Sequence, residues 1–94
     1  MNSIYVGDNV NADDQFYDVI QEGVAHGGVE ARKAIATYGY LHGELKDDPS
    51  EEVRECVAHE STNSYILHYL SADSSEKVKI AAMLNPMHGQ GTLF

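Results

Sequence analysis

The sequence contains one cysteine, Cys56, no tryptophan and two prolines in 94 residues. A single cysteine excludes an internal disulfide framework and any zinc or iron–sulfur site built from the cysteines of one chain. Basic residues are also scarce, with six Lys and Arg against fifteen Asp and Glu, a formal net charge of -9. Because nonspecific nucleic-acid binding depends on cationic side chains, we do not expect direct binding to DNA or RNA.

Long hydrophobic runs are missing as well, so no segment is expected to cross a membrane. The first residues have neither the basic start nor the apolar core of a secretory signal, and we expect a cytoplasmic protein. The length suits one domain over residues 1–94. Within it we expect an irregular segment over 1–11, helical repeats over 12–86 and a tail over 87–94.

The sequence does contain one segment in two similar copies, 25 residues apart. The copies, called the repeated phrase below, are DPSEEVREC from Asp48 and DSSEKVKIA from Asp73. A shared offset of this kind is typical of a structural repeat. Each phrase predicts the start of a helix, with Asp48 or Asp73 as the N-terminal cap and Glu51 or Glu76 completing a capping box three residues later. Pro49 suits the first helical position.

Apolar residues then recur on one face of each predicted helix. These residues are Val53, Cys56 and Val57 in one copy and Val78, Ala81 and Ala82 in the other. A weaker third copy places Ala34–Ala36 where Cys56–Ala58 stand, and Cys56 is expected to be a buried structural thiol. We predict an all-α fold of short helix pairs stacked as a small α-solenoid. The expected helices span about 12–24, 28–38, 40–46, 50–60, 63–71 and 75–84.

The N-terminal part carries weaker signals. Residues 11–14 (NADD) predict a cap for the first helix, and the glycines at 23, 27 and 28 are expected to end it. Residues 4–6 suit a short extended segment.

A wider pattern runs through residues 28–86. It consists of Asp48-Pro49 with Val53-Arg54, Val57-Ala58, Ile66-Leu67 with Leu70, Asp73, and Asn85-Pro86. This pattern resembles variant leucine-rich repeats, which are related in style to HEAT repeats. The resemblance implies a curved stack of short helices, which most such families use for protein contacts. One founding group of the family carries an iron–sulfur cluster beside its repeats, but this chain lacks the cysteines for one, and no cofactor is expected.

Catalytic motifs are not found, and we do not expect an enzyme. Five histidines are present, none in the spacing of a zinc-binding helix. His42 and His68 stand in neighbouring copies, so a metal pair formed from them is the basis of one alternative, a minor metal-binding protein or enzyme.

Tyrosines and the last helix are the candidate protein-binding surface. Tyrosine is favoured at interfaces, whereas the repeat-equivalent Tyr40 and Tyr65 are expected in the core or at a corner. In the last helix, apolar residues replace the more polar Glu55, Ala58 and His59 of the preceding copy. The candidates are Tyr38, Tyr69, Ile80, Met83, Leu84, Leu93 and Phe94. Either the tail folds back over this helix, or the helix is a dimer or partner interface.

Acidic residues form a second candidate surface, either simply solvated or able to attract a basic partner. Its members are Glu44, Asp47, Glu51, Glu52 and Glu55. Together these features predict a small, acidic, non-enzymatic protein-binding module that regulates or inhibits a partner with a basic or apolar surface, of the sort that bacterial viruses encode. The main alternative is a nucleic-acid mimic that blocks a DNA- or RNA-binding protein, as anti-restriction and anti-CRISPR proteins do.

Overall fold

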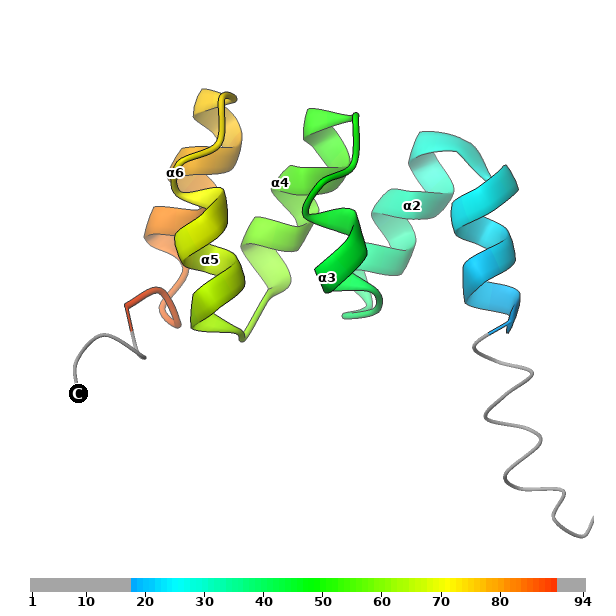
Figure 1. Cartoon of the computed structure of the whole chain (residues 1–94), viewed down its shortest axis with the longest axis horizontal. Coiled ribbons are helices and arrows are strands. Elements are labelled where there is room, and N and C mark those ends of the chain that lie inside the picture. The colour runs from blue at the N-terminus through cyan, green and yellow to red at the C-terminus, as the bar shows by residue number, and fades with distance from the viewer. Residues whose placement is uncertain (1–17, 90–94) are drawn as a thin grey trace, which may run out of the picture.

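The structure is a computed structural model that describes residues 18–89, in which there are helices and no strand. Residues 18–26 are helical. They are followed by α2 (Gly28–Thr37), α3 (His42–Leu45), α4 (Glu51–Glu60), α5 (Ser64–Leu70) and α6 (Glu76–Leu84) (Figure 1). The all-α prediction is confirmed here, and from α2 onward each bound lies within two residues of the expected one. The predictions for residues 4–6 and 11–14, and for Leu93 and Phe94, fall outside the described residues.

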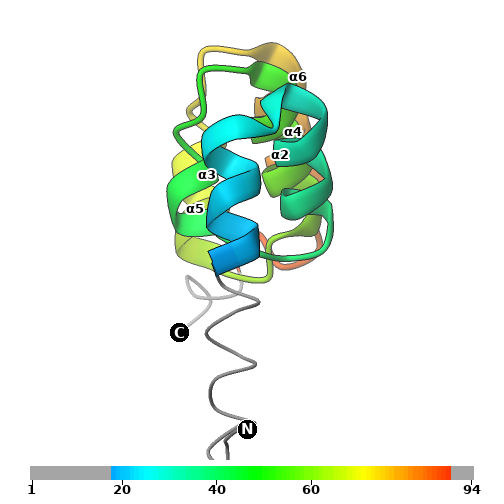
Figure 2. The same ribbon diagram turned by 90° about the vertical axis from the view of Figure 1, so that its right-hand side faces the viewer.

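The helices lie in two rows. Figures 1 and 2 show α2, α4 and α6 in one row and the helix of residues 18–26, α3 and α5 in the other. The most extensive contacts between helices join α4 to α6 and α2 to α4. The row of α2, α4 and α6 is therefore the most extensively packed part of the fold, and α4 lies at its centre.

The core runs between the two rows. Its buried side chains are Ala36, Leu45, Val53, Val57, Ala58, Ile66, Leu67, Leu70, Val78, Ala81 and Ala82. Val53, Val57, Val78 and Ala82 confirm the predicted inner faces of α4 and α6. Cys56 is only half-buried against this cluster rather than enclosed by it.

The prediction that Asp48 and Asp73 cap helices is wrong. Ser50 and Ser75 are the N-caps of α4 and α6, and their hydroxyl oxygens accept backbone N–H groups of the first turn. Each aspartate stands two residues earlier, where a guanidinium from another part of the fold reaches it. A charge-assisted bidentate bond is stronger than a neutral cap, so the carboxylate pairs with arginine and the serine is left to cap.

The predicted capping boxes are wrong for the same reason. The Glu51 carboxylate does not turn back to its own helix but accepts a hydrogen bond of 2.5 Å from the Ser75 hydroxyl. That bond joins the start of α4 to the start of α6. Pro49 precedes the N-cap of α4 and does not occupy the first helical position.

Tyr40 and Tyr65 were expected in the core or at a corner, and their exposed fractions of 41% and 78% exclude the core. Tyr40 lies between α2 and α3, and Tyr65 is the second residue of α5. In α5 the inward face is taken by Ile66, Leu67 and Leu70. Because the side chains of a helix advance by about 100° per residue, Tyr65 is turned outward.

Gly23 does not end the first helix, as the sequence suggested, but lies inside it. A Cβ atom at this position would stand 3.0 Å from Cδ1 of Ile35. Gly23 therefore permits the close approach of residues 18–26 to α2. The chain turns at Gly27 and Gly28 instead, and Gly28 has a φ of +76°, which favours glycine.

Candidate functional site

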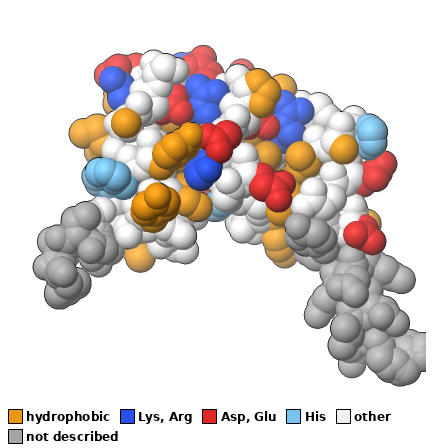
Figure 3. All heavy atoms as spheres, viewed as in Figure 1, with side chains coloured by type: hydrophobic (Ala, Val, Ile, Leu, Met, Phe, Trp, Pro, Cys, Tyr) orange, Lys and Arg blue, Asp and Glu red, His pale blue; other side chains and the backbone are white. Residues whose placement is uncertain are grey.

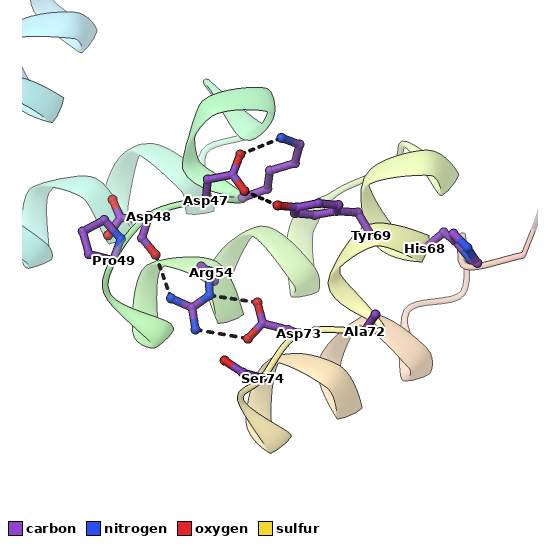
Figure 4. Close-up of a pocket in the computed structure, with 10 residues that line it drawn as sticks. Asp47, Asp48, Pro49, Arg54, His68, Tyr69, Ala72, Asp73 and Ser74 are labelled. Atoms are coloured by element: carbon purple, nitrogen blue, oxygen red, sulfur yellow. Dashed lines mark hydrogen bonds and ion pairs between the residues drawn. The ribbon is translucent and has the colours of Figure 1, made fainter.

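Two bidentate ion pairs connect successive parts of the fold. Arg32 of α2 donates to Asp48 through Nε at 2.6 Å and a second guanidinium nitrogen at 3.2 Å. Arg54 of α4 makes the same contact with Asp73, at 2.9 and 3.1 Å (Figure 4). All four side chains are largely buried. The residues aligned between the sequence copies thus make the same contact twice.

Each aspartate also organises the loop that follows it. A carboxylate oxygen of Asp48 accepts the N–H of Ser50 at 2.9 Å, and Asp73 accepts the N–H of Ser75 at 2.8 Å. Arg54 additionally donates to the backbone carbonyl oxygen of Asp48 at 2.7 Å. One guanidinium therefore ties together the loop before α4 and the loop before α6.

Hydrogen bonds between the partners shift the pKa values of Asp73, Arg54 and Arg32. Burial alone would raise the pKa of Asp73, but hydrogen bonds from the Arg54 guanidinium and the Ser75 N–H outweigh it, and the pKa is lowered. The hydrogen bond to Asp73 raises the pKa of Arg54, and the hydrogen bond to Asp48 raises the pKa of Arg32. The Arg54–Asp73 pair is consequently charged at neutral pH.

A polar cavity of about 660 Å³ opens beside the second pair. On its wall, the Tyr69 hydroxyl donates to Asp47, Lys46 pairs with Asp47 at 2.8 Å, and the Lys46 ammonium lies 4.7 Å from the centre of the Tyr69 ring (Figure 4). Hydrogen bonds from Lys46 and then Tyr69 lower the pKa of Asp47, and the bond to Asp47 raises the pKa of Tyr69. Tyr69, Asp47 and Lys46 thus form one network of a hydrogen bond, an ion pair and a cation–π contact on the cavity wall.

The candidate acidic surface is largely paired. Asp47 is bound as described, Glu51 accepts from Ser75, and Glu52 lies 3.5 Å from Lys33. Figure 3 shows Lys and Arg side chains beside Asp and Glu on the visible face rather than one continuous acidic field. Glu44 is exposed on α3.

Glu55 is half-buried on α4 and lies 3.7 Å from His59, one turn later in the same helix. Of the five acidic candidates, it is the least accessible to a partner.

The apolar candidates on α6 are exposed. Ile80, Met83 and Leu84 have exposed fractions of 49%, 60% and 77%. They lie on the side of α6 away from Val78 and Ala82, which are buried against the rest of the fold. The structure therefore brings these three predicted residues onto one accessible surface, which we call the α6 face.

The two candidate tyrosines lie elsewhere. Tyr38, at the end of α2, is strongly exposed, whereas Tyr69 on α5 is half-exposed and engaged with Asp47. Tyr38 borders a second, apolar cavity of about 380 Å³. The other residues that line it are Ile20, Ala34, Ile35 and Tyr40.

His42 is held within the fold, with Nε2 lying 2.8 Å from the carbonyl oxygen of Ala36. His68 is an exposed residue beside the polar cavity. Among residues 18–89, no group of three or more His, Cys, Asp and Glu side chains is placed to hold a metal ion.

Asn85 is a structural residue that chemical reasoning from the sequence missed. Its buried side-chain amide donates to the carbonyl oxygens of Ala58, His59 and Ser61, at 2.9 to 3.1 Å. Its Oδ1 accepts the N–H of Met87 at 2.8 Å. The only sequence signal was its place in the family resemblance, because the carbonyl groups it joins lie 24 to 27 residues away.

Comparison of the chain with protein-family models, with curated proteins and with solved structures finds no match. Within the described part of the chain, no helix has both the length and the hydropathy needed to span a membrane.

Proposed function

We propose that this protein is a non-enzymatic protein-binding module that regulates or inhibits its partner through the α6 face. The observation that supports the proposal is the exposure of Ile80, Met83 and Leu84 side by side on one helix. Exposed apolar side chains grouped in this way are typical of protein-interaction sites, and methionine adapts its shape to a partner.

The scaffold that we propose for this module is a short α-solenoid of the HEAT or variant leucine-rich repeat kind. Two features support it, the two rows of helices and the equivalent pairs Arg32–Asp48 and Arg54–Asp73. In such stacks each unit contacts its neighbours, and the terminal faces need a polar surface or a partner. Because the α6 face is apolar, we expect a partner to cover it.

The proposal is tested by capture of partners from a lysate, with wild type, Met83→Asp and a Glu51→Gln/Glu52→Gln double variant as parallel baits. At about 1 M salt, charges further apart than about 3 Å are screened. We expect a partner that stays bound to wild type and to the double glutamine variant at this salt concentration, and that is lost from Met83→Asp.

The alternative, a nucleic-acid mimic, draws its support from the net charge of -9. It predicts the reverse pattern in the same experiment. The captured protein would be released by salt or by added DNA, its binding would be weakened by the glutamine substitutions, and its binding would be unaffected by Met83→Asp. That pattern would contradict the α6 face as the binding surface.

A further inference from the structure

The row of α2, α4 and α6 is open at both ends within the described residues, and the two ends differ in shape. One end is the α6 face, and the other is the side of α2 that carries the apolar cavity. Between them, α4 is covered by α2 on one side and by α6 on the other. The contact of α4 with α6 thus shows how this row continues from one helix to the next.

Equivalent positions show which residues such a continuation covers. Ala36 in α2 and Ala58 in α4 are fully buried, and each is followed along the row by a further helix. The residue at the same position in α6 is Met83, which is 60% exposed. Met83 therefore stands where the two preceding helices are covered.

The side of each helix that faces the preceding helix in the row can be compared in the same way. Ala81 in α6 is buried where the helix faces α4, and Cys56 in α4 is half-buried. The equivalent residue in α2 is Ala34, which is exposed and lines the apolar cavity. The chain thus presents an exposed apolar side chain at one end and an apolar cavity of about 380 Å³ at the other.

Charged side chains also differ between the two ends. At one end, α6 carries Lys77 and Lys79 with one carboxylate, Glu76. At the other end, Arg32 and Lys33 of α2 pair with carboxylates of the same chain. The helix of residues 18–26, which lies beside α2 in the other row, carries exposed Asp18 and Glu22.

We propose that the partner of the α6 face is a second copy of this chain, bound head to tail. Met83 of one copy enters the cavity beside Ala34 of the next, so that α6 meets α2 as α4 meets α6 within the chain. Because the two surfaces are different, the contact is heterologous and repeats into an open assembly unless its rotation closes a ring. This inference rests on the proposed function, since it names the partner of the same face.

The test uses the full chain and two variants, Met83→Asp and Ala34→Asp, each of which places a charge at one end only. Sedimentation equilibrium follows the average mass of each protein, and of their equimolar mixture, up to about 1 mM. We expect the wild-type mass to rise with concentration beyond twice the 10.3 kDa of one chain. Each variant alone stays a monomer, and the mixture forms a dimer and stops there.

The mixture is decisive because Met83→Asp keeps an intact α2 end and Ala34→Asp keeps an intact α6 end. Dimer formation also shows that both variants are folded. If Ala34→Asp self-associates like wild type, the contact joins two α6 faces and head-to-tail binding is wrong. Wild type that is monomeric at about 1 mM also overturns the inference.

Leu84→Asp is the matched control. Leu84 is more exposed than Met83, at 77% against 60%, and the equivalent residues Thr37 and His59 remain exposed although further helices follow them. Head-to-tail stacking therefore leaves Leu84→Asp able to associate, and its loss of association would contradict the proposed geometry. Monomeric wild type that still captures a different protein through Met83 would leave the proposed function standing without this inference.

Discussion

The helices α4 and α6 begin with the same sequence phrase but end in different surroundings. In α4, Val53, Val57 and Ala58 are fully buried, and helices contact both sides. In α6, Val78 and Ala82 are buried as their equivalents are, but Met83, at the position of Ala58, is exposed. The phrase therefore determines how a helix begins and which side faces the core, while the opposite side depends on what lies beyond it.

The largest expected effect comes from the same substitution at these two equivalent positions. Ala58→Asp buries a carboxylate with no partner and should destabilise the fold by about 4 kcal/mol or more. Met83→Asp changes an exposed side chain and should alter the free energy of unfolding by less than about 0.5 kcal/mol. Urea unfolding followed by far-ultraviolet circular dichroism measures both. Equal changes in the free energy of unfolding for the two variants would mean that Met83 is not exposed in solution.

The next effect concerns the amide that joins the ends of α4 and α6. Asn85→Asp replaces a donor to three carbonyl groups with a carboxylate, and should cost about 2–3 kcal/mol. Asn63, the N-cap of α5, is the matched control because its side chain accepts the N–H groups of Tyr65 and Ile66. Asn63→Asp keeps that acceptor and should change stability by about 0.5 kcal/mol or less. An unchanged free energy of unfolding for Asn85→Asp would show that the Asn85 amide does not stabilise the fold.

A smaller effect, with a defined pH dependence, is expected at the ion pair between α4 and the loop before α6. Asp73→Asn should cost about 1–2 kcal/mol at neutral pH. Because the pKa of Asp73 is lowered in the fold, its contribution is complete above the unfolded pKa and is lost as the pH falls through the folded one. The free energy of unfolding of wild type should therefore fall between about pH 5 and pH 2, and that of Asp73→Asn should fall less. An equal fall in wild type and in Asp73→Asn would show that the pair with Arg54 does not stabilise the fold.

The smallest effect is local. The hydrogen bond to Asp47 raises the pKa of Tyr69, so Tyr69 should ionise at higher pH than a tyrosine without such a partner. Asp47→Asn should lower the midpoint of this titration, followed by the absorbance of tyrosinate, with Tyr69→Phe identifying the signal. An unchanged midpoint would mean that Asp47 and Tyr69 do not interact in solution.

The sequence predicted the helices well because their causes are local. Apolar spacing and capping residues place the start and end of each helix within a few residues, and Val53, Val57 and Val78 take the inner faces as expected. The ion pairs that Asp48 forms with Arg32 and Asp73 forms with Arg54 could not be predicted in the same way. An aspartate before a helix suits a cap as well as an ion pair, and Arg32 and Arg54 lie 16 and 19 residues away from their partners.

The candidate surface was predicted in part. Ile80, Met83 and Leu84 were identified because they are more apolar than Glu55, Ala58 and His59 in the preceding copy, and the structure places the three together in the open. The sequence left open whether Tyr65 lies in the core or at a corner, since which of several apolar residues face inward depends on how α5 packs against α6. The partners of the acidic side chains were missed too, because Lys33 and Glu52 meet only in the folded chain.

The short span of the tertiary contacts has a consequence for the rate of folding. The bonds that tie the helices together close loops of 16 residues between Arg32 and Asp48, 19 between Arg54 and Asp73, and 27 between Ala58 and Asn85. The entropy lost on closing a loop grows with its length, and domains whose contacts are close in sequence reach the native state quickly. Within residues 18–89, we therefore expect folding to proceed through a succession of short loop closures rather than through encounters between residues far apart in the sequence.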